Sequence, residues 1–126
     1  MIVTKRIYEP VDERDGYRVL IDRLWPRGVS KTAAHLDEWA KTLSPSNELR
    51  HWYGHDPAKW EEFQRRYAEE LDTEEAQLVL NALVARAKRG RVTLLYSARE
   101  ASISNAEALL RLLEARGAHT QAHAHR

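Results

Sequence analysis

The segment "YRVLIDRLWPRG" (residues 17–28) indicates the fold most clearly. Its first half is apolar on nearly consecutive positions, as in a strand that is covered on both faces of a parallel sheet. Pro26 and Gly28 are expected to end the strand, because proline lacks a backbone donor and glycine favours turns. Four polar or aromatic side chains follow the apolar run directly: Asp22, Arg23, Trp25 and Arg27. So dense a group at the end of a buried strand predicts a binding site.

Two further segments have the pattern of strands. Residues 2–7, "IVTKRI", alternate apolar and polar side chains, which predicts a strand with one wet face. Residues 91–97, "RVTLLYS", are apolar on consecutive positions, which predicts a strand buried on both faces. Strands separated by long helical segments require crossover connections, and these join parallel strands. The predicted fold class is therefore α/β, with a short, mostly parallel sheet flanked by helices in a single small domain.

Helices are predicted wherever a capping residue precedes apolar side chains at helical spacing. The stretch 30–43 fits either a helix or an irregular strand in its second half, and we favour a short helix capped by Ser30 followed by an extended piece. The other predicted helices run from Ser46 to Gly54, from Asp56 to Leu71, from Thr73 to Arg89 with Gly90 as the stop, and from Ser104 to Gly117.

The length and composition indicate one globular domain. A chain of 126 residues can build a core without metal or disulfide staples, and no linker, repeat or low-complexity block divides it. Residues 1–117 are predicted to form the single α/β domain. Residues 118–126, "AHTQAHAHR", lack a core pattern and are predicted to be a mobile C-terminal tail.

Charge, cysteine content and hydropathy restrict the class of function. A formal net charge of +1 provides no overall field that would gather nucleic acid, so any attraction of an anion must be local. The sequence has no cysteine for disulfides or thiolate chemistry, and no segment resembles a signal peptide or a membrane helix. A cytoplasmic protein without a membrane partner is predicted. No glycine-rich nucleotide loop is present, and no cofactor is predicted.

The polar residues after two strands predict a ligand site, because ligands of parallel sheets collect beyond the carboxyl ends of the strands. Guanidinium groups suit the oxygens of phosphate or carboxylate groups, so the predicted ligand is a small anion. Arg23, Arg27 and Arg99 are expected to clamp it. Asp22 is expected to orient one arginine, and Trp25 to wall the pocket. The full set predicted to bind the ligand is Asp22, Arg23, Trp25, Arg27, Arg50, Ser97, Arg99 and Asn105.

Some of these residues also fit purely structural roles. Asp22 and an arginine fit a purely structural ion pair, with Trp25 filling the core. His55 is a candidate for a general acid or base, or else for a structural hydrogen bond in the turn between two helices. His51 and His55 are four residues apart, but Gly54 breaks the helix between them, and no metal site is predicted.

A second class of function uses the same residue types. Exposed Trp25, Trp52 and Tyr53 with flanking arginines would suit a surface that binds a protein or a nucleic-acid strand. Composition does not separate this interaction module from a small-ligand protein, whereas the shape of the surface does: a concave pocket favours the small ligand. The pattern does not define a homo-oligomeric state.

The segments "RVLIDRLWPRGVSK", "GHDP" and "VTLLYSARE" resemble the YeaO-like branch of the bacterial family known as domain of unknown function 488. The resemblance extends from about Ile2 to Leu113, and it implies a stand-alone cytoplasmic α/β protein without supplying a reaction. Relatives commonly have Asn-His-Ala where this chain has Ser104, Asn105 and Ala106. Asparagine can form a hydrogen bond there but does not titrate, so the resemblance leaves open whether this protein is an enzyme.

Overall fold

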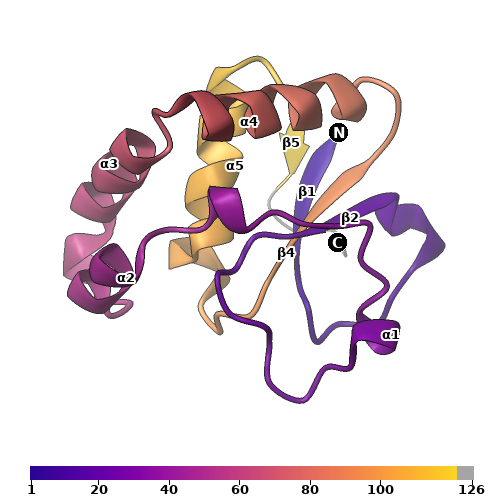
Figure 1. Cartoon of the computed structure of the whole chain (residues 1–126), viewed down its shortest axis with the longest axis horizontal. Helices are drawn as coiled ribbons and strands as arrows, with labels where there is room; N and C mark the ends of the chain where they lie inside the picture. The colour runs from indigo at the N-terminus through magenta and orange to yellow at the C-terminus, as the bar shows by residue number, and fades with distance from the viewer. Residues whose placement is uncertain (122–126) are drawn as a thin grey trace.

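All the strands in residues 1–121, the part of the chain that the computed structural model describes, belong to one parallel sheet (Figure 1). The order across the sheet is β3-β2-β4-β1-β5, and every neighbouring pair is parallel. The predicted α/β class with a parallel sheet is confirmed. The strands are β1 (Ile2–Arg6), β2 (Tyr17–Leu20), β3 (Glu38–Trp39), β4 (Val92–Tyr96) and β5 (Thr120–Gln121).

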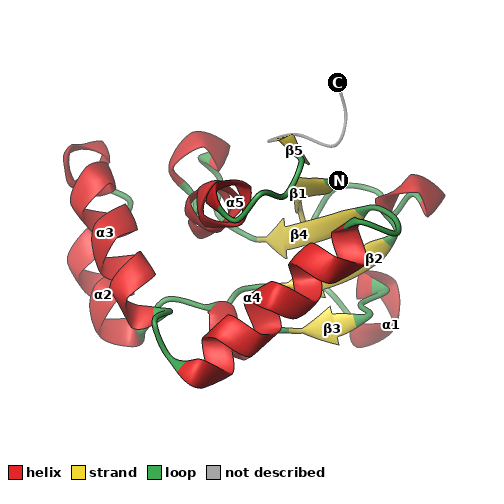
Figure 2. Cartoon of the chain, turned by 90° about the horizontal axis from the view of Figure 1, so that it is seen from above, coloured by secondary structure: helices red, strands yellow, loops and turns green. Residues whose placement is uncertain are grey.

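The helices cover the two faces of the sheet unequally. One face packs against α2, α3, α4 and α5 in a large apolar core, whereas the other meets α1 and loops in a smaller one. Figure 2 shows α1 beside β3, away from α2, α3 and α5. Within residues 1–121, no helix has the length and hydropathy that crossing a bilayer requires. The helices are α1 (Lys31–Ala34), α2 (Asn47–Tyr53), α3 (Trp60–Glu70), α4 (Glu74–Ala87) and α5 (Asn105–Ala115).

Side-chain caps define where most helices begin, as predicted. Ser46 accepts a hydrogen bond from the Leu49 N–H at the start of α2, and Ser30, Thr73 and Ser104 cap their helices in the same way. Asp56 also caps, but a short 3₁₀ helix, Pro57–Lys59, precedes α3. The prediction for Gly90 is wrong: α4 ends at Ala87, and Gly90 is not left-handed.

Two sequence predictions about the sheet are corrected. The polar side chains of β1 are buried instead of wet, since β1 lies inside the sheet and both of its faces are covered. Thr4 and Lys5 point to opposite faces, and both are almost inaccessible. Residues 118–121 of the predicted mobile tail contact the core and sheet, because β5 pairs with β1 through backbone groups and needs no apolar pattern. The rest of that predicted tail, residues 122–126, lies outside the described residues.

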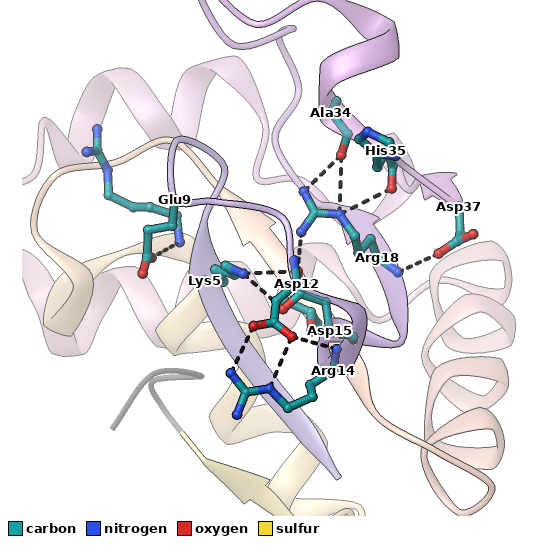
Figure 3. A network of polar contacts seen from close by, with 11 residues as sticks. Lys5, Glu9, Asp12, Arg14, Asp15, Arg18, Ala34, His35 and Asp37 are labelled. Atoms are coloured by element: carbon teal, nitrogen blue, oxygen red, sulfur yellow. Dashed lines mark hydrogen bonds and ion pairs between the residues drawn. The ribbon is translucent and has the colours of Figure 1, made fainter.

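A buried ionic network ties β1 and β2 to α1 (Figure 3). Lys5 Nζ donates to both carboxylate oxygens of Asp15, at 2.9 and 3.0 Å, and Arg18 Nη1 donates to Asp15 Oδ2 at 2.6 Å. Arg18 also donates to the carbonyls of Ala34 and His35 at the end of α1. The three charged side chains are at most 4% exposed. Two buried cations therefore depend on one carboxylate.

Asp15→Asn should destabilise the protein by about 3–5 kcal/mol, because removal of the shared carboxylate leaves Lys5 and Arg18 buried without a counter-charge. Glu62→Gln is the matched control, since Glu62 pairs with Arg65 and Arg66 on the exposed surface of α3. Its cost should stay below about 1 kcal/mol. Urea denaturation of both variants measures these free energies, and similar losses in the two would contradict the role assigned to Asp15.

The same carboxylate should make stability depend on acid pH. Burial by itself would raise the pKa of Asp15, but hydrogen bonds from Lys5, Asp12 N–H and Arg18, with the charge of Lys5, outweigh it and lower that pKa. Such a group stabilises the fold above its unfolded pKa of about 3.9, and this contribution is lost as the pH falls through the lower folded value. We expect the free energy of unfolding to decline below about pH 4, and less steeply in Asp15→Asn. Denaturation curves at successive pH values test this, and equal acid slopes would contradict it.

Candidate functional site

A cleft of about 1080 Å³ opens where β1, β2 and β4 end. Its walls come from the loops after these strands, from α2 and from the beginning of α5. All nine residues that sequence reasoning proposed line this one cleft: Asp22, Arg23, Trp25, Arg27, Arg50, His55, Ser97, Arg99 and Asn105. Sequence reasoning missed Arg6 and Tyr8, which also line it. The only sequence signal for them was their position, because Arg6 is the last residue of β1 and Tyr8 follows that strand.

Asp22 holds the loop after β4 against the end of β2. Its Oδ2 accepts hydrogen bonds from Ser97 N at 3.0 Å and Ser97 Oγ at 2.7 Å, and its Oδ1 accepts one from Asn105 Nδ2 at 3.0 Å. The prediction that Asp22 orients an arginine is wrong: within residues 1–121 this carboxylate forms no ion pair. The physical reason is the sheet order, because β2 and β4 are neighbours and their ends bring Ser97 directly to Asp22.

Arg6 fixes the other side of the same loop. Its Nε donates to the carbonyls of Ser97 at 3.2 Å and Ala98 at 2.9 Å, and its Nη2 donates to Ser97 O at 2.8 Å. The guanidinium carbon lies 4.8 Å from the centre of the Tyr8 ring. The Tyr8 hydroxyl donates to the Arg27 carbonyl at 3.0 Å, which links the loops that follow β1 and β2. One arginine thus shapes the cleft and still presents N–H groups to it.

Arg23 and Arg50 belong to the side of the cleft formed by α2. Arg23 Nε donates to the carbonyl of Pro45 just before α2, at 3.2 Å, and Arg50 Nη1 donates to Asn47 Oδ1 at 2.9 Å. Neither contact neutralises the charge, since both acceptors are uncharged. Most N–H groups of each guanidinium remain available for an anion.

No guanidinium of the cleft has an acidic partner in the described part of the chain. Arg27 and Arg99 are exposed, and the described residues show no side-chain hydrogen bond or ion pair from either. The alternative of a purely structural ion pair between Asp22 and an arginine is therefore not observed in residues 1–121. The five arginines that line the cleft are Arg6, Arg23, Arg27, Arg50 and Arg99.

The aromatic residues expected on an exposed surface are largely covered. Trp25 is half-buried: its Nε1 donates to Val29 O at 2.6 Å, and its ring meets Trp39 edge-on at 5.2 Å. Trp52 is half-buried with the cations of Lys59 and Arg66 against its ring. Tyr53 is buried, so the expectation that all three are exposed is wrong. Their apolar faces contribute to packing instead.

Tyr53 forms part of the cleft wall through packing. Its ring stacks on Phe63 at 4.0 Å, and its hydroxyl donates to the Ile103 carbonyl at 2.7 Å. Burial, assisted by the charge of Asp56, raises the pKa of Tyr53 to about 12, so this phenol stays protonated at neutral pH. Tyr53 consequently joins α2 to the segment before α5 and does not act as a base.

His55 lies at the rim of the cleft in a left-handed backbone conformation, with φ of 54°. The side chain is exposed, its ring is 5.6 Å from that of Tyr53, and the described residues show no hydrogen bond to it. The structural hydrogen bond offered as an alternative for His55 is therefore not observed. Over residues 1–121, no three histidine or acidic side chains gather in a way that could hold a metal ion.

Comparisons with known proteins give consistent matches over most of the chain. A family model described as "Inactive DUF488-N3 subclade" matches residues 1–126. The chain is 42% identical over 105 residues to the uncharacterized protein YeaO of Escherichia coli strain K12, covering 83% of this chain and 90% of YeaO. It is 41% identical over 111 residues to the uncharacterized protein Rv3073c of Mycobacterium tuberculosis H37Rv, covering 88% and 92% respectively. No solved structure gives a significant match.

Ser97→Ala tests whether Asp22 anchors the cleft. The change removes the hydroxyl donor but keeps the Ser97 backbone donor, so we expect a loss of about 1.5–3 kcal/mol, the range for a hydrogen bond to a charged group. Ser102→Ala, at an exposed position in the 3₁₀ helix Ala101–Ile103 that follows the loop, should change stability by less than about 0.5 kcal/mol. Thermal or urea unfolding measures both, and an unchanged stability of Ser97→Ala would show that the Asp22 contact is unimportant.

Proposed function

Because this chain belongs to the DUF488-N3 subclade described as inactive, we propose that the protein binds a small phosphate- or carboxylate-bearing ligand without transforming it. The proposed site is the cleft at the strand ends. The family resemblance recognised in the sequence is correct, and the word "inactive" in the family's description supports binding over catalysis. A cytoplasmic location stays a prediction.

The observation that carries the proposal is the set of five arginines in one cleft without an acidic partner among the described residues. Five guanidinium groups outnumber the carboxylates of Asp22 and Glu100 in the lining of the cleft. The excess positive charges repel one another, so their convergence costs stability unless an anion occupies the space between them. Arginine also offers paired N–H groups that match two oxygens of a phosphate or carboxylate. A ligand of this charge would satisfy donors that the protein itself leaves open.

The position and size of the cleft support a small molecule. Ligands of parallel sheets bind beyond the carboxyl ends of the strands, which is where this cleft lies. Its volume of about 1080 Å³ is slightly above the range of about 300–1,000 Å³ found for small-molecule pockets. A single inorganic ion would fill only a part of it, so we infer that the anionic group belongs to a larger metabolite.

An interaction module for a protein or a nucleic-acid strand has less support. Such surfaces use exposed aromatic and arginine anchors, but Trp25 and Trp52 are half-buried and Tyr53 is buried. The arginines instead line a concave site. Catalysis that uses His55 stays an untested prediction, because no described group orients its ring.

Arg27→Ala should weaken the binding of phosphate by about tenfold or more without a loss of stability, because the exposed side chain has no protein partner to lose. Arg89→Ala removes the same charge from an exposed position before β4, at the opposite edge of the sheet, and should leave the affinity unchanged. Isothermal titration with inorganic phosphate and with citrate, at low and high salt, measures the effect. If both variants bind the anions equally weakly, the loss of affinity reflects only the change in net charge and not a site at Arg27. If the unaltered protein binds neither anion, the proposal is refuted.

A further inference from the structure

The cleft contains a second chemical feature beside its arginines. Asp22, Ser97 and Asn105, named here the acceptor cluster, are half-buried, line the cleft and are joined by three hydrogen bonds. These bonds hold the Asp22 carboxylate in place although five guanidinium groups line the same cleft. Within residues 1–121, the Asp22 carboxylate therefore forms no ion pair with an arginine.

The acceptor cluster has unused capacity for hydrogen-bond donors. A carboxylate has about four acceptor positions, and Asp22 uses three of them. Ser97 Oγ gives its proton to Asp22, which leaves lone pairs on that oxygen. Asn105 donates through Nδ2, and its Oδ1 accepts no hydrogen bond from any described residue. Three oxygen-bearing side chains thus offer acceptors to whatever enters the cleft.

Hydroxyl groups are the donors that suit this arrangement best. A carboxylate beside the bound anion would repel it, unless the ligand places donor groups between its own charge and Asp22. An ammonium group would satisfy Asp22 but would be repelled by the five arginines, which outnumber Asp22 and Glu100 in the cleft. A neutral hydroxyl is attracted to the carboxylate without that cost. Neighbouring hydroxyls can also bind two acceptors at once.

Resting on the proposed function, we propose that the ligand is a phosphorylated polyol of the sugar-phosphate class. The arginines bind its phosphate, and the acceptor cluster binds its hydroxyls, with Asp22 as the residue that determines specificity. The size of the cleft accommodates a molecule with both parts. The two halves of the site then have different tasks: one provides attraction to any anion, and the other distinguishes among anions.

Titration calorimetry with three phosphate esters tests this division. Ribose 5-phosphate has hydroxyls, ethyl phosphate has none, and phosphoethanolamine has an ammonium group instead. We expect the unaltered protein to bind ribose 5-phosphate about tenfold or more tightly than either of the others, the factor expected from hydrogen bonds to a charged acceptor. In Asp22→Asn, which keeps the shape of the side chain, this preference should fall to about threefold or less, because the charged acceptor for the ribose hydroxyls is lost.

The outcomes separate this inference from the proposed function. Equal binding of the three esters, or tighter binding of phosphoethanolamine, would overturn the polyol assignment and leave anion binding intact. Binding of none would overturn both. If folded Asp22→Asn still prefers ribose 5-phosphate, Asp22 does not determine the specificity of the site. If thermal unfolding shows that this variant does not fold, Asn105→Ala replaces it: the preference should fall by about threefold, and an unchanged preference would overturn the proposal.

Discussion

The parallel pairing of β2 with β4 is the constraint on which the cleft depends. Leu20 lies opposite Leu95, so the two strands leave the sheet at the same level, and Asp22 and Ser97 meet although 75 residues separate them in the chain. The pairing of β4 with β1 then brings Arg6 to the carbonyls of the same loop. The ends of β1, β2 and β4 thus converge on Ser97 and Ala98.

The sequence allowed the location of this convergence to be predicted, but not its internal contacts. Carboxyl ends of parallel strands meet at one edge whatever the order of the strands, so Asp22, Arg27 and Arg99 could be assigned to one cleft from periodicity alone. The partner of Asp22 depends on which strand lies beside β2, and no local pattern encodes that. Arg6 was missed for a related reason, because its segment was predicted to be a strand with one wet face.

The buried network of Lys5, Asp15 and Arg18 shows where hydrophobic patterning fails. Charged residues at alternating positions normally indicate solvent, yet here they lie under α1 and the loops of the smaller core. The network replaces apolar packing on the face of the sheet that lacks long helices. The need for glycine at position 16 has a related cause. Gly16 has φ of 64°, and an added Cβ would lie 2.2 Å from the carbonyl oxygen of Arg91. The chain there approaches β4 too closely for any other residue.

The place of β1 in the sheet also has a consequence for the order in which the protein folds. Of the five strands of the sheet, β1 is made before the others, whereas its partners β4 and β5 are made after the other two. Until residue 96 has been made, the strand that carries Lys5 has no neighbour with which to pair, and closing so long a loop is slow. Cooperative folding of the central sheet therefore waits until β4 has been made, and until then the nascent protein must keep an unpaired β-strand from associating with other chains.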